Sequence, residues 1–236
     1  MTTLAFSSLT GTQQDQKVEH EFRIPRFKRV LDIALSLPAL IASLPACVLI
    51  ALAILIDSRG PVFYAQERVG LDRRRRNWIF NGAERREKVG YGRPFKVYKF
   101  RSMIMNAEKN VGPVWALRKD PRATRVGTFL RRTHLDELPQ FFNVMRGDMT
   151  IVGPRPERPQ MVRSLVVDLP EYALRSRVLP GITGLAQIRN GYDDSLESAA
   201  RKVQYDLYYM RNASLSLDLQ IMASTAAVLA CGKEKS

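Results

Sequence analysis

The 236-residue sequence contains few cysteines and, relative to its basic residues, few acidic ones. Cys47 and Cys231 have no spacing that suggests a disulfide framework or a metal site, and such a chain fits a reducing, cytosol-facing environment. The 23 acidic residues face 37 lysines and arginines, which gives a formal net charge of +14. This charge predicts attraction to phosphate groups, carried by nucleic acid, anionic lipid or a sugar nucleotide. The length fits one globular domain with attachments.

Long uncharged runs are also scarce, and the longest covers residues 33–56. At about 1.5 Å per residue, this run is long enough to cross a hydrocarbon core of roughly 30 Å. No small-residue cleavage site follows it, which argues against a cleavable signal peptide. Pro38 and Pro45 lie inside the run and predict a bend, and Pro45 is the expected break because it lies nearer the centre.

Basic residues flank this run on both sides, with Arg26 and Lys28 before it and Arg59 and Arg68 after it. Because basic flanks tend to stay on the cytoplasmic side, a simple span is unfavourable. A re-entrant helix with both flanks in the cytoplasm removes the conflict. An ordinary membrane span or a buried core helix remains the alternative, since proline is tolerated in membrane helices.

Residues 68–101 carry most of the net positive charge, +9 of +14, with twelve basic and three acidic side chains. Such a stretch beside a membrane segment predicts attraction to anionic lipid headgroups; a merely solvated loop is the alternative. Nucleic-acid binding is not expected, because neither zinc-finger spacing nor an aromatic RNA-binding signature is present. Within the stretch, alternating apolar and basic residues up to Arg101 predict a strand that presents cations, including Lys99, on one face.

An acidic pair, Asp136 and Glu137, stands ahead of an apolar segment. Thr133 precedes Asp136 by three residues, a spacing that predicts a helix start with both acids near its positive end. Two adjacent carboxylates can divide the roles of nucleophile or metal ligand and general base. Arg131 lies close enough to hold a phosphate beside them. The alternative is that the acids merely favour the helix dipole at the surface.

Two turn-rich segments follow the acidic pair. In the first, residues 151–158, one glycine and two prolines fix the backbone around Arg155, and Arg155 and Arg158 are candidate phosphate ligands. The prolines could equally terminate a strand. In the second, Gln187 and Arg189 are available to a bound ligand.

Ordered motifs along the chain resemble the bacterial sugar transferase family, the monotopic phosphoglycosyl transferases that initiate exopolysaccharide, capsule or glycan assembly. The motifs are KRVLD (28–32), GPVFYAQERVG (60–70), FKVYKFRSM (95–103), HLDELPQFFNVMRGDM (134–149), VGPRPE (152–157), PGITGLAQ (180–187) and YDLYYMRN (205–212). The match covers residues 28 to about 225.

The resemblance implies an α+β fold with one compact catalytic domain, an N-terminal re-entrant membrane helix and interfacial amphipathic helices. We therefore expect a flexible basic tail over residues 1–27, a helix-break-helix over 28–58 and a cytoplasmic domain over 59–236. The apolar residues 215–230 are short for a span and are expected to form a core or in-plane interfacial helix. The implied location is the cytoplasmic face of the bacterial inner membrane.

The implied reaction moves a sugar-1-phosphate from a UDP-sugar to undecaprenyl phosphate and releases UMP. The resemblance makes Asp136 the nucleophile and the Mg²⁺ contact, with Glu137 as its partner. The matching positions for the other active-site residues are Lys99, Arg131, Arg155 and Asp206. The family usually has serine directly before the proline at the helix break, whereas this chain has Leu44 before Pro45 and a serine at Ser43.

Two other functions remain open at this point. One is a non-catalytic, membrane-tethered polybasic module that binds anionic lipid or nucleic acid. The other is a metal-dependent hydrolase of a lipid diphosphate. The sequence reveals neither the sugar, for which glucose and galactose are both reasonable, nor the oligomeric state.

Overall fold

The protein is described by a computed structural model over residues 27–72, 92–105, 107, 120–190 and 195–231. Most of the expected N-terminal tail and the arginine-rich loop around residues 73–88 lie outside the described residues. The helices and strands follow the order α2 (Phe27–Asp57), β1 (Phe63–Val69), β2 (Pro94–Phe100), α3 (Arg125–Thr133), η1 (Leu135–Glu137), α4 (Gln140–Arg146), β3 (Thr150–Val152), α5 (Pro159–Asp168), η2 (Pro170–Arg177), β4 (Gly181–Thr183), α6 (Leu185–Arg189), α7 (Leu196–Asn212) and α8 (Leu215–Cys231).

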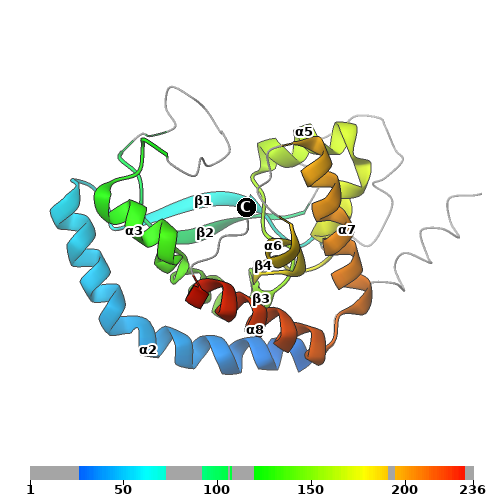
Figure 1. Cartoon of the computed structure of the whole chain (residues 1–236), viewed down its shortest axis with the longest axis horizontal. Coiled ribbons are helices and arrows are strands. Elements are labelled where there is room, and N and C mark those ends of the chain that lie inside the picture. The colour runs from blue at the N-terminus through cyan, green and yellow to red at the C-terminus, as the bar shows by residue number, and fades with distance from the viewer. Residues whose placement is uncertain (1–26, 73–91, 106, 108–119, 191–194, 232–236) are drawn as a thin grey trace, which may run out of the picture.

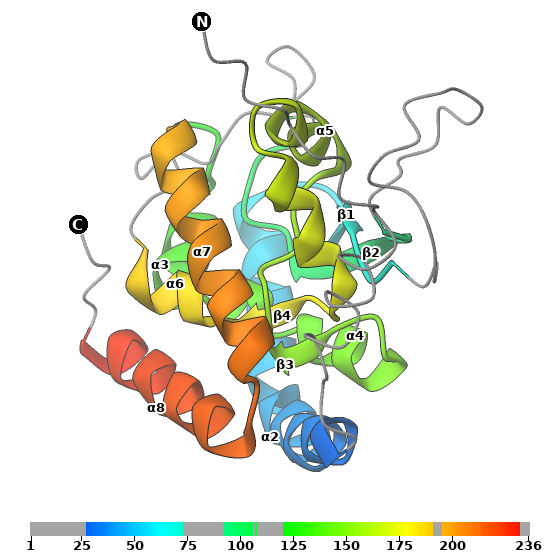
Figure 2. The same cartoon turned by 90° about the vertical axis from the view of Figure 1, so that its right-hand side faces the viewer.

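The described strands form two small sheets. β1 and β2 pair as an antiparallel ladder, whereas β3 and β4 pair in parallel. Helices surround both sheets, with α2 curving beneath and along one side of the domain (Figure 1). Turned by 90°, the same structure places α2 and α8 together at the base of the molecule, with α5 at the opposite end (Figure 2). The α+β prediction is confirmed.

Helix α2 is 31 residues long and, within the described residues, is the one helix long and apolar enough to cross a membrane. The helix continues through Pro38 and Pro45, so the expected interruption into two helices at Pro45 is replaced by curvature of one helix (Figure 1). Pro45 removes one backbone donor, and Ser43 Oγ supplies a nearby bond by donating to the Leu40 carbonyl at 2.9 Å. This bond involves the Leu40 carbonyl, whereas the carbonyl that loses its donor at Pro45 is that of Ile41.

The N-terminal end of α2 is held to the domain by buried polar contacts. Lys28 Nζ lies 2.6 Å from Asp218 Oδ2 on α8. Asp32 Oδ1 accepts hydrogen bonds from Thr150 Oγ1 at 2.9 Å and from the Ile151 amide at 3.0 Å. Because these charged groups are buried, their partners specify one position of the helix end against α8 and β3.

The C-terminal end of α2 is held to the same domain. Asp57 Oδ2 accepts a hydrogen bond from the Val126 amide at the start of α3, at 3.0 Å. Arg101, just after β2, donates to the Ser58 carbonyl at 2.6 Å and to the Arg59 carbonyl at 2.7 Å. These bonds satisfy groups at the α2 terminus that have no partner within the helix.

Between its two ends, α2 exposes a band of large apolar side chains: Val30, Ile33, Leu35, Leu37, Ile41, Leu44, Val48, Leu49, Leu52, Leu55 and Ile56. Helix α8 also exposes Leu215, Leu219 and Leu229 while burying Asp218 and Ile221. A continuous apolar surface of this kind marks an interaction with lipid or protein. Residues 215–230, expected to form a core or in-plane helix, lie in α8. One face of α8 packs on the domain and the other is exposed.

The larger buried core lies between the β3–β4 sheet and helices α5, α7 and α8, with Val152, Val203 and Met210 at its centre. A smaller core joins α2 to the site described below. There Ile50 and Ile54 of α2 pack with Phe100 and Leu130, and Leu135 and Leu138 pack against this group. Apolar packing therefore places η1 directly over the C-terminal half of α2.

The strand predicted before Arg101 is present as β2, but its lysines do not share one face as predicted. Tyr64 of β1 pairs with Lys99, and Glu67 pairs with Lys96. Since side chains alternate along a strand, Lys96 and Lys99, three positions apart, project from opposite faces. Lys99 shares its face with Tyr64, Gln66 and Arg68 of β1.

Candidate active site

The acidic pair lies in η1, one turn of 3-10 helix just before α4, so the predicted helix start is present, but His134 and not Thr133 stands at its N-cap. Thr133 ends α3, and its hydroxyl donates to the Phe129 carbonyl at 2.9 Å, so it caps no helix start. His134 then adopts a left-handed backbone conformation with φ 55° and breaks the helix. Asp136 and Glu137 follow in η1.

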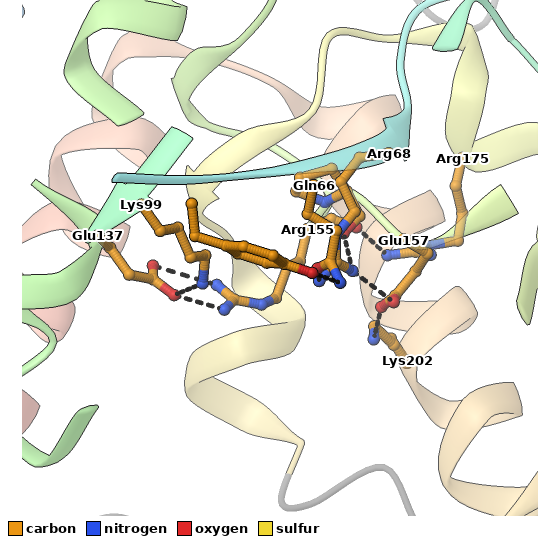
Figure 3. Close-up of polar contacts among 10 residues, drawn as sticks. Gln66, Arg68, Lys99, Glu137, Arg155, Glu157, Arg175 and Lys202 are labelled. Atoms are coloured by element: carbon orange, nitrogen blue, oxygen red, sulfur yellow. Dashed lines mark hydrogen bonds and ion pairs between the residues drawn. The ribbon is translucent and has the colours of Figure 1, made fainter. Parts of the chain in front are cut away.

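Glu137 is neutralised by two cations, Lys99 of β2 and Arg155 of the loop after β3. Its Oε1 atom lies 2.6 Å from Lys99 Nζ and 2.6 Å from Arg155 Nη2 (Figure 3). Burial alone would raise the pKa of Glu137, but the charges of Arg155 and Lys99 outweigh it and hold the pKa well below its usual range. We refer to Lys99, Glu137 and Arg155 as the Glu137 cluster.

The environment of Asp136 differs from that of Glu137. Its side chain is buried, with 7% of the residue exposed. Among the described residues, none forms a hydrogen bond or an ion pair with its carboxylate. Burial raises the pKa of Asp136 despite the opposing charge of Lys99. The structure thus provides one acid already committed to two cations and one acid available to a ligand.

A second carboxylate group of similar construction lies beside the first (Figure 3). Glu157 Oε1 lies 2.6 Å from Lys202 Nζ of α7, and Glu157 Oε2 lies 3.6 Å from Arg68 Nη1 of β1. Burial alone would raise the pKa of Glu157, but Lys202, Arg175 and Arg68 lower it to about 2. We refer to Arg68, Glu157 and Lys202 as the Glu157 cluster.

The loop that carries Arg155 and Glu157 is packed backbone to backbone against the loop after Pro180. A Cβ atom on Gly184 would lie 2.2 Å from the Gly153 carbonyl oxygen, and one on Gly181 would lie 2.2 Å from the Gly153 amide nitrogen. Only glycine permits this approach. The two turn-rich segments of the sequence therefore form one unit that supports Arg155.

The remaining expected ligands lie apart from the Glu137 cluster or in the interior. Arg131 Nη1 lies 3.7 Å from Asp120 Oδ2, and Asp120 also pairs with Arg122. Asp206, expected to bind substrate, is 1% exposed and accepts a hydrogen bond from Arg175 at 2.7 Å. Asp206 thus faces Arg175 in the interior, and its assignment to substrate binding stays a prediction.

Gln187 and Arg189 lie exposed on α6, which packs against α7 and α8. Gln187 Nε2 donates to the Ile182 carbonyl at 3.1 Å. None of the contacts within the described residues joins either side chain to the Glu137 cluster. Their assignment to substrate binding remains a prediction.

Sequence reasoning gave no role to several residues that the structure brings to this region: Arg68, Glu157, Arg175 and Lys202. Arg68 and Glu157 stand inside motifs, which is the one signal that could have marked them. Arg175 in η2 and Lys202 in α7 stand in no motif, and only the tertiary fold brings them to the loop.

A small pocket opens beside this loop and is lined by apolar residues together with Arg155, Glu157, Arg175 and Ser176. Buried cations and paired acids thus gather in one α+β domain that also carries an apolar surface on α2, and such clusters mark candidate functional sites.

The chain belongs to the bacterial sugar transferase family, whose model matches residues 24–232.

Three relatives illustrate the range of this family. A UDP-glucose:undecaprenyl-phosphate glucose-1-phosphate transferase of Klebsiella pneumoniae is 43% identical over 205 residues, covering 84% of this chain and 39% of the relative. A UDP-N-acetylgalactosamine-undecaprenyl-phosphate N-acetylgalactosaminephosphotransferase of Aeromonas hydrophila is 38% identical over 205 residues, covering 87% of this chain and 44% of the relative. The exopolysaccharide production protein PSS of Rhizobium leguminosarum is 39% identical over 203 residues, covering 84% of this chain and 92% of the relative.

The chain thus spans about two fifths of the length of the first two relatives and nearly all of the third. The named sugars differ between relatives.

Proposed function

We propose that the chain transfers a sugar-1-phosphate from a UDP-sugar to undecaprenyl phosphate and releases UMP. The observation that carries the proposal is the contrast inside the acidic pair. Asp136 has no partner among the described residues, whereas Glu137 is neutralised by Lys99 and Arg155. A free carboxylate next to a cation-rich pocket is what nucleophilic attack on a phosphorus atom requires.

In the first step, an Asp136 carboxylate oxygen attacks the phosphorus that bears the sugar. The bond from this phosphorus to the bridging oxygen breaks, UMP leaves with the electron pair, and the sugar phosphate is esterified to Asp136. In the second step, a phosphate oxygen of undecaprenyl phosphate attacks the same phosphorus and releases the Asp136 carboxylate. Phosphoryl transfer depends mostly on positioning and on charge stabilisation, which Lys99 and Arg155 can provide.

Mg²⁺ is the proposed cofactor, and the residues fit a site that the substrate completes. No group of three His, Cys, Asp or Glu side chains is close enough to cage a metal in the part of the chain that the structure describes. Mg²⁺ usually binds through one or two carboxylates plus substrate phosphates, so Asp136 suffices on the protein side. When bound, the ion would neutralise charge on the diphosphate. Glu137 is occupied by its two cations and is not needed as a ligand.

The proposed membrane arrangement follows from the two ends of α2. At 31 residues the helix is roughly 46 Å long, enough to cross a bilayer if it were straight and upright. Lys28 and Asp32 at one end, and Asp57 at the other, bind elements of the same domain. A span would put these ends on opposite sides of the membrane. We therefore propose that α2 enters and leaves the membrane from one side, and the basic flanks favour the cytoplasmic face.

The proposed pathway role is the first membrane step of exopolysaccharide or capsule assembly. The Rhizobium leguminosarum relative, which the chain covers almost completely, is named for exopolysaccharide production. Anionic lipids of the inner membrane would be drawn to the basic residues that flank α2 in the sequence. The competing polybasic module would need no free acid beside the Glu137 cluster.

The test uses purified protein in nanodiscs with Mg²⁺ and a panel of UDP-glucose, UDP-galactose and UDP-N-acetylgalactosamine. We expect UMP release from at least one donor, and a lipid-linked product only when undecaprenyl phosphate is added. Omitting the lipid should leave a protein that carries one phosphosugar, detected by intact mass. Asp136→Asn should lower transfer on the order of 10⁴-fold.

The matched control is Asp148→Asn, because Asp148 is partly exposed and pairs with Arg146 at 3.3 Å outside the Glu137 cluster. This variant should keep normal transfer. Retained activity in Asp136→Asn would exclude Asp136 as nucleophile. Absence of UMP release from every donor, with anionic lipid binding intact, would favour the polybasic module instead.

A further inference from the structure

The loop that presents Arg155 has an unusual hydrogen-bond pattern in its backbone. Four consecutive carbonyl groups, those of residues 154–157, each accept a hydrogen bond. Gly181 and Val69 amides donate to the first and the last of them, at 2.9 and 2.8 Å. Arginine side chains donate to the middle two, from Arg175 to the Arg155 carbonyl at 3.0 Å and from Arg68 to the Pro156 carbonyl at 3.1 Å.

Arg175 is itself fixed on three sides. Its Nε atom donates to Asp206 Oδ2 at 2.7 Å, and its Nη2 atom donates to the Arg155 carbonyl. Its guanidinium carbon lies 4.6 Å from the centre of the Tyr172 ring, a cation–π distance. With 6% of its side chain exposed, Arg175 is buried beneath the loop.

The carbonyl that Arg175 holds belongs to the residue whose guanidinium reaches Glu137. A change in the backbone at Arg155 would swing its side chain away from Glu137 and from any phosphate beside Asp136. Misplacement of a catalytic group by about 1 Å can cost on the order of 10²-fold in rate. Through the Arg155 carbonyl, the buried Arg175 can therefore influence the site without contacting substrate.

We propose that Arg175, oriented by Asp206, is a positioning residue that fixes the Arg155 backbone so that the Arg155 guanidinium is held ready for the donor diphosphate. This inference rests on the proposed function, since it gives Arg155 the diphosphate as its ligand. It also gives Asp206 a role, because Asp206 orients Arg175, and Arg175 in turn holds the backbone of Arg155. Arg68 performs the equivalent task at the next carbonyl.

Lysine cannot replace Arg175 in this role. A planar guanidinium donates from separate nitrogens to Asp206 and to the Arg155 carbonyl while stacking on Tyr172, whereas an ammonium is a single point of donation. Arg175→Lys keeps the charge opposite Asp206 and therefore tests positioning with the least disturbance of folding.

The experiment is a double-mutant cycle on transfer activity in the full chain, with Arg175→Lys, Arg155→Lys and the double variant. Arg175→Lys alone should lower kcat/KM by about 10-fold, the size expected for a supporting residue. In the Arg155→Lys background the same change should lower kcat/KM by less than about twofold, because Arg155 no longer needs its exact position. Arg163→Lys, on the exposed face of α5, is the matched control and should change nothing.

Equal losses from Arg175→Lys in both backgrounds would overturn the inference, since a residue that only stabilises the fold would act independently of Arg155. Unchanged kcat/KM in Arg175→Lys would overturn it as well. If Arg175→Lys does not fold, Arg68→Lys is measured in the same cycle, and equal losses in both backgrounds would again overturn the inference. Failure of the proposed function looks different, because the unsubstituted chain would then release UMP from none of the UDP-sugar donors.

Discussion

The Glu137 cluster and the Glu157 cluster are built alike and lie side by side (Figure 3). Each places a glutamate oxygen 2.6 Å from a lysine and adds an arginine. The clusters differ in what lies next to them. The Glu137 cluster adjoins Asp136, which has no partner among the described residues, whereas the Glu157 cluster adjoins Asp206, which is committed to Arg175.

The comparison shows that paired charges alone do not mark a catalytic site. Buried ion pairs lower the pKa of a glutamate in both places. Under the proposed function, Asp136, which has no partner among the described residues, is what separates a catalytic role from a supporting one. We therefore expect substitutions of Glu157 and Lys202 to act mainly on stability and those in the Glu137 cluster mainly on activity.

The largest effect on stability should come from Glu157→Gln. This change leaves Lys202 and Arg68 without their charge partner, and uncompensated buried charges cost about 3–5 kcal/mol. Urea or thermal unfolding in detergent measures the loss. Glu197→Gln, in the exposed first turn of α7, is the control and should change the stability little. Equal stability of the two variants would contradict the supporting role of the Glu157 cluster.

The next effect concerns pH. The folded pKa of Glu157 is about 2 against an ordinary value of 4.5. Its contribution is therefore complete above pH 4.5 and is lost as pH falls from about 4.5 to about 2. The loss should be on the order of 3 kcal/mol. Unfolding measured at several pH values in this window should show a flatter dependence for Glu157→Gln; an unchanged slope would exclude the ion pair as its source.

Glu137→Gln should lower kcat/KM by roughly 10- to 100-fold, because Lys99 and Arg155 lose the carboxylate that orients them. Its unfolding midpoint should fall less than that of Glu157→Gln. Glu171→Gln, exposed on η2, serves as the control in the same UMP-release assay. An activity loss in Glu157→Gln as large as that in Glu137→Gln would erase the distinction between the clusters.

The smallest effect is a shift in the pH profile. Lys99 lowers the pKa of Asp136, which burial otherwise raises. Removing this charge in Lys99→Met should raise the Asp136 pKa further, so the acid limb of kcat/KM moves to higher pH. Lys96→Met, on the opposite face of β2, should leave the limb in place. Identical profiles for both variants would mean that another group sets the limb.

The sequence predicted those features that depend on local pattern. The uncharged run 33–56 became α2, and the alternation around Lys99 became β2. A helix start was predicted at the acidic pair and is present as η1, but the predicted cap was wrong, because His134 in a left-handed conformation, and not Thr133, stands at the N-cap. A single backbone conformation of this kind leaves no periodic signal.

The contacts that support Arg155 could not be predicted from the sequence, for a different reason. Arg175 and Lys202 come from η2 and α7 and meet the loop only through tertiary packing. Asp206 was located by its motif, but a motif does not say whether a side chain faces a ligand or the interior. The structure places Asp206 in the interior, against Arg175.

The attachment of both ends of α2 to one domain has an electrical consequence. A charge that crosses a bilayer does work against the membrane potential, about 2.3 kcal/mol per 100 mV. If Lys28 and Asp57 remain on the same side, neither moves through the field when the helix enters the lipid. Insertion of α2 should then proceed equally well in energised and de-energised membranes, driven by the apolar side chains between its ends.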